Sequence, residues 1–241
     1  MKKVFFIFRW FSVIALLIFL LVFTKDRQAI QKTSLYDISI KESTDNFIDK
    51  QIILDYLDSK LVDFNGVLIT DFNKGRIEKI LELHPSIKKV EVFADQKGRI
   101  KIIIEQKKAI VRIKSNSDDY YLDEFGSRME LSNNYTPQLI VATGDISKKN
   151  HCGIYDFIRK INDLDFWNAQ IIQIHFDKND IFLIPRVGGH KINIGNFENI
   201  LEKLDNLYHF YKLAMPIKGW QTYSDINLKF SNQIVCVKKQ I

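Results

Sequence analysis

A chain of 241 residues with 46% hydrophobic side chains can bury a core and hold one or two domains. Its formal net charge is +6, but Lys2, Lys3 and Arg9 stand before or inside an N-terminal apolar run, so the rest of the chain is only mildly basic. No basic helix carries interleaved aromatic residues. The sequence therefore predicts no nucleic-acid partner, and it indicates no small-molecule substrate.

The first 23 residues, MKKVFFIFRWFSVIALLIFLLVF, predict a membrane anchor. Trp10 to Phe23 alone is too short to span a hydrocarbon core of about 30 Å, but the run from Val4 to Phe23 is long enough if Arg9 reaches the headgroups. A cleaved signal peptide is the alternative, although the run does not end in small residues. The basic residues favour a cytoplasmic tail over residues 1–3, and a polar linker follows over residues 24–33.

Residues 34–108 predict a small α+β domain with the order strand, helix, helix, strand, strand. Asp49 is the expected N-cap of the first helix, and Pro85 ends a second helix that begins near Asn73. Two alternating strands flank the turn DQKG at residues 95–98. Two helices can cover one face of a three-stranded sheet and leave a sheet edge free to accept an extended segment of another chain.

Residues 109–241 predict a second, mainly antiparallel β domain that contains two helices and ends in a strand. One helix is expected over residues 153–164, and the other after an N-cap at Asn196. The second helix carries an apolar stripe that predicts a core-facing surface. The stripe consists of Phe197, Ile200, Leu201, Leu204, Leu207, Tyr208 and Tyr211.

Several short stretches resemble catalytic or ligand-binding motifs, but each has a simpler structural interpretation. DEFG at residues 123–126 echoes a kinase triplet without its companion loops, and RVGGH at residues 186–190 is followed by no helix, so both predict hairpin turns. The five histidines form no metal-binding spacing. The sequence thus predicts no catalytic residue, no cofactor and no metal site, and the protein is expected not to be an enzyme.

The two cysteines, Cys152 and Cys236, leave two interpretations open. An oxidising compartment would permit a disulfide that closes a long loop, but spacing alone cannot show that the two residues approach each other. Two unpaired, buried thiols are the favoured prediction.

Four stretches in this order resemble the FtsQ/DivIB family of bacterial cell-division proteins: RIEKILELHPSIKKVEVFAD, GRIKIIIEQKKAIVRI, YYLDEFGSRMELSNNYTPQLIVATG and YSDINLKFSNQIVC. The resemblance covers essentially the whole chain. Ala109 departs from the family, which often has proline at this point, and a long cytoplasmic tail is missing, which puts cytoplasmic partner contacts in doubt.

The resemblance implies a non-enzymatic scaffold of the divisome, anchored by a single span in the inner membrane and linking division proteins at the septum. The first domain would be a POTRA domain, and the second a β domain. The implied partners are small single-span proteins of the FtsL and FtsB/DivIC type, which add an extracytoplasmic segment to the last strand of the β domain.

Carried over by position, the resemblance points to a partner-binding segment near the C-terminus. Its residues are Asn227, Lys229, Phe230, Asn232, Ile234, Val235 and Val237. A terminal strand has an unpaired edge, which agrees with this role. Lys229, Lys238 and Lys239 would then meet acidic partner residues. The alternative is that Phe230, Val235 and Val237 simply pack inward.

Two other functions are alternatives to a scaffold role. A chaperone for polypeptide transport or envelope assembly also uses POTRA domains, but such proteins carry tandem copies followed by a long β-barrel. An anchored envelope hydrolase would need a convergent set of acid, base and nucleophile, which the sequence does not offer.

Overall fold

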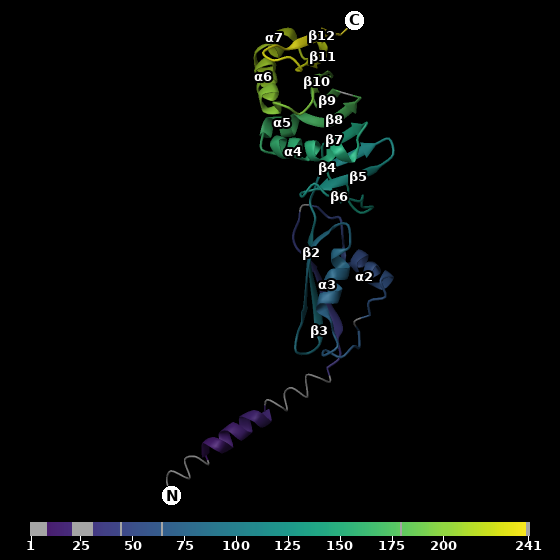
Figure 1. The fold of residues 1–241 in the computed structure, drawn as a ribbon, viewed down its shortest axis with the longest axis vertical. Coiled ribbons are helices and arrows are strands. Elements are labelled where there is room, and N and C mark those ends of the chain that lie inside the picture. Colours follow the sequence, from purple (N-terminus) through teal and green to yellow (C-terminus); the bar gives the residue numbers. More distant parts are fainter. Residues whose placement is uncertain (1–8, 21–30, 44, 64, 179, 240–241) are drawn as a thin grey trace. The chain divides into compact units, whose positions relative to one another are not determined.

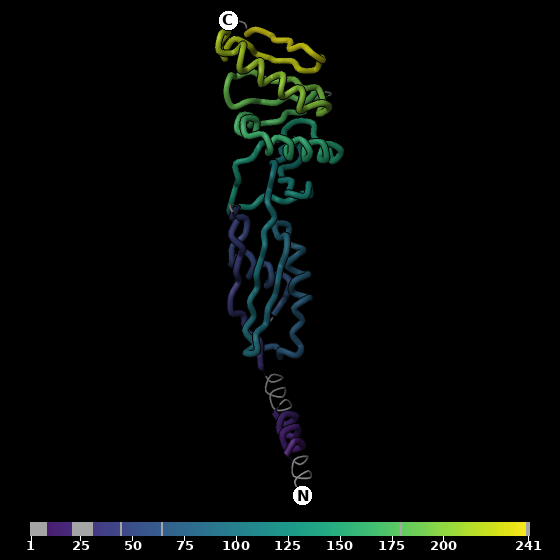
Figure 2. The backbone as a smooth tube through the Cα atoms, turned by 90° about the vertical axis from the view of Figure 1, so that its left-hand side faces the viewer, coloured from purple at the N-terminus to yellow at the C-terminus, as the bar shows by residue number. Residues whose placement is uncertain are grey.

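The computed structural model describes residues 9–20, 31–43, 45–63, 65–178 and 180–239 of the chain. The protein divides into two compact units, of which the first ends at Gln106 and the second begins at Lys107. Each unit encloses its own hydrophobic core. Figures 1 and 2 show the course of the chain through both.

Residues 9–20 form a helix with exposed apolar side chains; Phe19, for example, is 64% exposed. Over the part of the chain that the structure describes, no helix has both the length and the apolar character to span a membrane. Arg9 and Trp10 of the predicted anchor begin this helix, whereas Val4 and Phe23 lie outside the described residues.

The first unit confirms the predicted order of strand, helix, helix, strand and strand. Its elements are β1 (Ser34–Ile40), α2 (Lys50–Ser59), α3 (Lys74–Glu82), β2 (Ile87–Ala94) and β3 (Arg99–Gln106). The sheet has the order β1-β3-β2, with β1 parallel and β2 antiparallel to the central strand. Figure 1 shows α2 and α3 on one side of this sheet, so the fold has two layers.

Local sequence accounts for the ends of the two helices. The Asp49 carboxylate accepts the backbone N–H of Ile52 at 2.9 Å, which confirms the predicted N-cap of α2, and Asn73 caps α3 in the same way. Between β2 and β3, Gly98 adopts a φ of +75°, and a Cβ there would collide with the carbonyl oxygen of Lys32. Only glycine suits this turn.

The core of the first unit lies between the helices and the sheet. Ile100, Ile102 and Ile104 of β3 are fully buried beneath Ile53 and Leu81 of the helices. Each such side chain stabilises the fold by roughly 1.5–3 kcal/mol relative to leaving it exposed. The alternation predicted for this strand is therefore confirmed, because its outward residues are only partly buried.

The second unit is built on a nine-stranded sheet. Its strands are β4 (Ala109–Ser115), β5 (Asp119–Asp123), β6 (Arg128–Met129), β7 (Val141–Gly144), β8 (Ile171–Asp177), β9 (Asp180–Pro185), β10 (Lys191–Gly195), β11 (Tyr223–Asn227) and β12 (Val235–Lys238). The order across the sheet is β12-β11-β10-β9-β8-β7-β4-β5-β6. Five neighbouring pairs are antiparallel and three are parallel, so the sheet is mixed although mainly antiparallel.

Both helices predicted for this unit are present, but its described residues contain four helices, so the predicted number was wrong. The helices are α4 (His151–Asn162), α5 (Asp165–Gln170), α6 (Ile200–Leu213) and α7 (Met215–Lys218), with a 3₁₀ turn over Lys148–Asn150. Figure 1 shows α4, α5 and α6 along one side of the sheet. The two helices that the sequence missed, α5 and α7, are too short for a helical period to be visible.

The start and the inward face of α6 also differ from the prediction. The helix begins at Ile200 after Asn199, not after an N-cap at Asn196. Its buried residues are Ile200, Leu204, Leu207 and Tyr211. Leu201 and Tyr208 were predicted to face the core, but they are 52% and 38% exposed. The apolar stripe is thus wider than the surface that the sheet covers.

Candidate partner-binding edge

Strand β12 forms one edge of the nine-stranded sheet. It pairs with β11 in antiparallel register, with Ile226 opposite Cys236 and Asn227 opposite Val235. On its other side no strand of the described chain pairs with it. An edge strand of this kind offers unpaired N–H and C=O groups to an incoming segment.

The direction of the backbone groups along β12 follows from two contacts. The N–H of Lys239 donates to the carbonyl of Thr222 at 3.0 Å, and the carbonyl of Val237 lies 3.4 Å from the hydroxyl of Ser224, which donates to it. Residues 237 and 239 therefore direct their backbone groups toward β11. Because these groups alternate along a strand, those of Cys236 and Lys238 point away from β11, toward the open edge.

The side chains of β12 are largely exposed. Val235 is 43% and Val237 is 55% exposed, so the alternative that these two residues pack inward is wrong. Cys236 and Ile234 pack against the core instead, and burial raises the pKa of the Cys236 thiol. The valines thus give the edge an apolar surface on the face opposite the core.

A short loop, residues 228–234, connects β11 to β12. Its first turn is held by the side chain of Asn227, whose oxygen accepts the N–H of Lys229 at 2.9 Å. The ammonium of Lys229 lies 3.0 Å from Asp180, and Asn193 donates to the same carboxylate at 2.8 Å. These hydrogen bonds, from Asn193 and then Lys229, lower the pKa of Asp180. The loop is therefore tied to β9.

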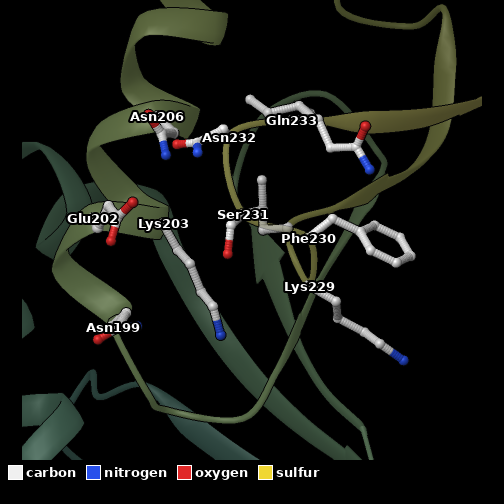
Figure 3. Close-up of a pocket in the computed structure, with 11 residues that line it drawn as sticks. Asn199, Glu202, Lys203, Asn206, Lys229, Phe230, Ser231, Asn232 and Gln233 are labelled. Atoms are coloured by element: carbon white, nitrogen blue, oxygen red, sulfur yellow. The ribbon is translucent and has the colours of Figure 1, made fainter.

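A small pocket of about 50 Å³ lies between this loop and α6 (Figure 3). Ser231 and Asn232 line it from the loop, and Glu202 and Asn206 from the helix. In Figure 3 the side chains of Lys229 and Phe230 point away from α6. The pocket has room for about one or two water molecules and is too small for a ligand. Phe230, at 49% exposed, lies at the surface.

The structure places the predicted binding residues in three environments. Phe230, Val235 and Val237 are exposed, as a contact surface requires. Ile234 packs on the core, and Asn227 stabilises the loop. Asn232 adopts a φ of +59° and lines the pocket. The last three residues thus shape the loop that presents the others.

Two of the three lysines predicted to meet a partner are engaged within the chain. Lys229 pairs with Asp180, and Lys239 donates to the side chain of Gln221 at 2.9 Å. Lys238 forms no side-chain hydrogen bond or ion pair in the part of the chain that the structure describes. Sequence reasoning missed Asp180, because it lies about fifty residues earlier in the chain and no local pattern links it to the loop.

The motifs set aside at the sequence level behave as turns. DEFG joins β5 to β6, where the buried carboxylate of Asp123 accepts the N–H groups of Phe125 and Ser127. RVGGH joins the antiparallel strands β9 and β10. Cys152 and Cys236 are free, as predicted, but Cys152 is exposed and Cys236 is only partly buried, so the prediction of two buried thiols was wrong. The described residues contain no cluster of three or more metal-binding side chains.

Both units match known protein families. Residues 108–237, more than half of the chain, match the family described as "FtsQ/DivIB, C-terminal related". The chain belongs to the FtsQ/DivIB family. Residues 31–105 match the POTRA-like domain. The predicted family resemblance and the predicted POTRA-like domain followed by a β-rich domain are therefore confirmed.

Other comparisons are more distant. A solved structure of the major extracytoplasmic domain of the cell division protein DivIB from Geobacillus stearothermophilus aligns with 13% identity and a TM-score of 0.33; the alignment covers 46% of this chain and 94% of that one. No curated protein matches the chain in sequence. Membership of the FtsQ/DivIB family indicates a scaffold role in cell division, with other proteins as partners.

Proposed function

We propose that the protein is a non-enzymatic scaffold of the divisome that links division proteins at the septum. Residues 4–23 anchor it in the inner membrane with the N-terminus in the cytoplasm, and both units face the extracytoplasmic side. The partners are single-span proteins of the FtsL and FtsB/DivIC type. An extended segment of one partner adds to β12 as a tenth strand of the sheet.

One observation carries this proposal: β12 is an ordered sheet edge that pairs on one side only. The backbone groups of Cys236 and Lys238 point toward the open side, and two exposed valines flank them. Main-chain hydrogen bonds would supply affinity, and contacts with Val235, Val237 and Phe230 would supply specificity. Lys238 is available to pair with an acidic partner side chain.

A single substitution can test partner binding at the open edge without disturbing the fold. Lys238→Pro removes an N–H that points away from β11, so the β11–β12 ladder keeps its hydrogen bonds while the partner loses one. We expect the full-length Lys238→Pro protein to fold normally and to lose partner proteins that co-purify with the wild type from solubilised membranes. Lys238→Ala is the matched control, because it removes the charge and keeps the N–H.

The outcomes distinguish the site from the function. If Lys238→Pro and the wild type co-purify the same division proteins, β12 is not the binding edge. If outer-membrane assembly or secretion components co-purify instead, the scaffold function itself is wrong, and the transport-chaperone interpretation replaces it. Loss of partners in Lys238→Pro but not in Lys238→Ala supports a main-chain ladder at this edge.

A further inference from the structure

An apolar groove lies between α5 and α6 in the second unit, on a different face of α6 from the pocket beside the β11–β12 loop. Its volume is about 510 Å³, which is within the range of sites that hold ligands. The lining residues are Asp163, Leu164, Asp165, Phe166, Trp167, Leu201, Leu204, Asp205 and Tyr208. The groove thus runs along about two turns of α6, from Leu201 to Tyr208.

The rim of the groove exposes apolar side chains that the rest of the described chain does not cover. Phe166 is 42%, Leu201 is 52% and Tyr208 is 38% exposed. The ring of Phe166 packs edge-on against both Trp167 and Tyr208, with centroids 4.9 and 5.2 Å away. Trp167, only 4% exposed, forms the floor. A contiguous surface of this kind marks an interaction site more often than scattered apolar residues do.

The charge of the groove is entirely acidic. Asp163, Asp165 and Asp205 are the only charged residues among those that line it. Asp205 also contacts His209, whose Nε2 lies 3.7 Å from the carboxylate on the exposed side of α6. The chain outside the N-terminal apolar run is mildly basic, so the acidic groove differs in charge from the rest of the protein. An occupant with positive charge matches it, and an anionic lipid or nucleic acid does not.

The elements that line the groove favour a helical occupant over an extended one. Helices α5 and α6 and the turn before α5 supply the lining, and no sheet edge is among them. An extended peptide would find no ladder partner here for its buried N–H and C=O groups. A helix satisfies these groups internally, so an amphipathic helix can bury its apolar face at no such cost.

We propose that this groove binds a cationic amphipathic helix of another protein. Apolar residues of the helix at i, i+3 or i+4, and i+7 fill the groove over Trp167, between Phe166 and Leu201. Lysine or arginine residues flanking that stripe pair with Asp163, Asp165 and Asp205. The site shares no residue with β11, β12 or the loop that connects them.

The test uses the full-length protein in a neutral detergent and a synthetic probe. The probe is a fluorescent amphipathic peptide of leucine and lysine, about 14 residues or four helical turns long. A peptide with glutamate in place of lysine serves as the charge control. Fluorescence anisotropy measures affinity for the wild type and for each variant in the same detergent, so any background binding to micelles is common to all.

Leu201→Lys places a charge in the groove at an exposed position and should therefore leave the fold intact. We expect it to weaken binding of the lysine peptide at least tenfold, and Asp205→Lys to act in the same direction. Leu213→Lys is the matched control, because Leu213 lies on the same helix, is 67% exposed and does not line the groove. It should change affinity less than about twofold. Circular dichroism confirms that each variant is folded.

Three results would overturn the proposal. The first is equal binding of the glutamate peptide, because charge would then not select the occupant. The second is an unchanged affinity of Leu201→Lys, because the peptide would then bind elsewhere. The third is displacement of the peptide by a chitin oligosaccharide, because aromatic and carboxylate side chains also bind sugars and the groove would then be a glycan site.

Discussion

The two edge strands of the nine-stranded sheet, β6 and β12, differ in how well they are protected from pairing with another strand. At one end β6 is only two residues long; Met129 is buried, and Arg128 lies 2.8 Å from Glu130 and over the ring of Tyr120. At the other end β12 is twice as long and exposes two valines. Proteins protect sheet edges with short strands and charged residues. The sheet is therefore closed to pairing at β6 and open to it at β12.

The largest expected effect concerns the protected end. Asp123, fully buried beside β6, accepts two backbone N–H groups and lies 3.2 Å from Lys107. Asp123→Ala would leave both donors and the lysine without this partner. We expect the free energy of unfolding, measured by urea denaturation, to fall by about 3 kcal/mol. A loss below about 0.5 kcal/mol would show that this end is no more rigidly built than β12.

The next effect concerns His190, a buried residue that precedes β10 near the open end. Its Nε2 lies 2.6 Å from the hydroxyl of Tyr211, and burial lowers its pKa below the ordinary value of 6.5. The unfolded chain therefore binds the proton more readily than the folded chain. The stability that His190 contributes is complete above about pH 6.5 and is lost as the pH falls from there toward the folded-state pKa.

We expect the free energy of unfolding, measured in urea, to be lower at pH 5.5 than at pH 7.5 because of this residue. His84 and His151 also have pKa values lowered by burial, so they add to the slope in the wild type. His190→Gln removes only one of these contributions. Its stability should depend less steeply on pH than that of the wild type. An equal slope would show that His190 binds its proton as readily in the folded protein as in the unfolded chain.

Substitution of a valine on the open edge should weaken partner binding without lowering the stability of the fold. Val237→Lys changes an exposed side chain, so we expect the free energy of unfolding to change by less than about 0.5 kcal/mol. Co-purification of a β12-bound partner should fall several-fold, because the partner would meet a charge in place of an apolar contact. Val111→Lys at a fully buried position of β4 is the contrasting variant, and it should fail to fold.

The smallest effect on partner binding is expected at the ion pair between Lys229 and Asp180. Both side chains are partly exposed, at 40% and 29%, so Lys229→Ala should lower the free energy of unfolding by about 0.5 kcal/mol. Partner binding should weaken more than stability, because the loop that presents Phe230 loses its tie to β9. Hydrogen exchange of the loop amides in the wild type and the variant measures this loosening.

The sequence predicted the first unit better than the second, for physical reasons. The caps at Asp49 and Asn73 and the alternation in β3 are local signals, and the structure confirms them. The parallel pairing of β4 with β7 and of β7 with β8 brings together distant segments that carry no local mark. The sequence could therefore indicate strands in the second unit, but not their order.

The same limit applies to the candidate sites. That the last strand lies at an edge was predicted and is confirmed, whereas its role in binding stays a prediction. The groove could not be predicted, since Leu201 and Tyr208 fit the apolar period of α6 as well as its buried residues do. Which members of that stripe are covered depends on tertiary packing, which a local period does not show.

Helix α6 supplies residues to two surfaces at once. Glu202 and Asn206 face the loop before β12, whereas Leu201 and Tyr208 line the groove beside α5. An occupant of one surface that shifted this helix would change the shape of the other surface. The resulting coupling free energy must be equal in both directions, so a ligand in the groove would change the affinity of the β12 edge by the same factor that a β12 partner changes the affinity of the groove.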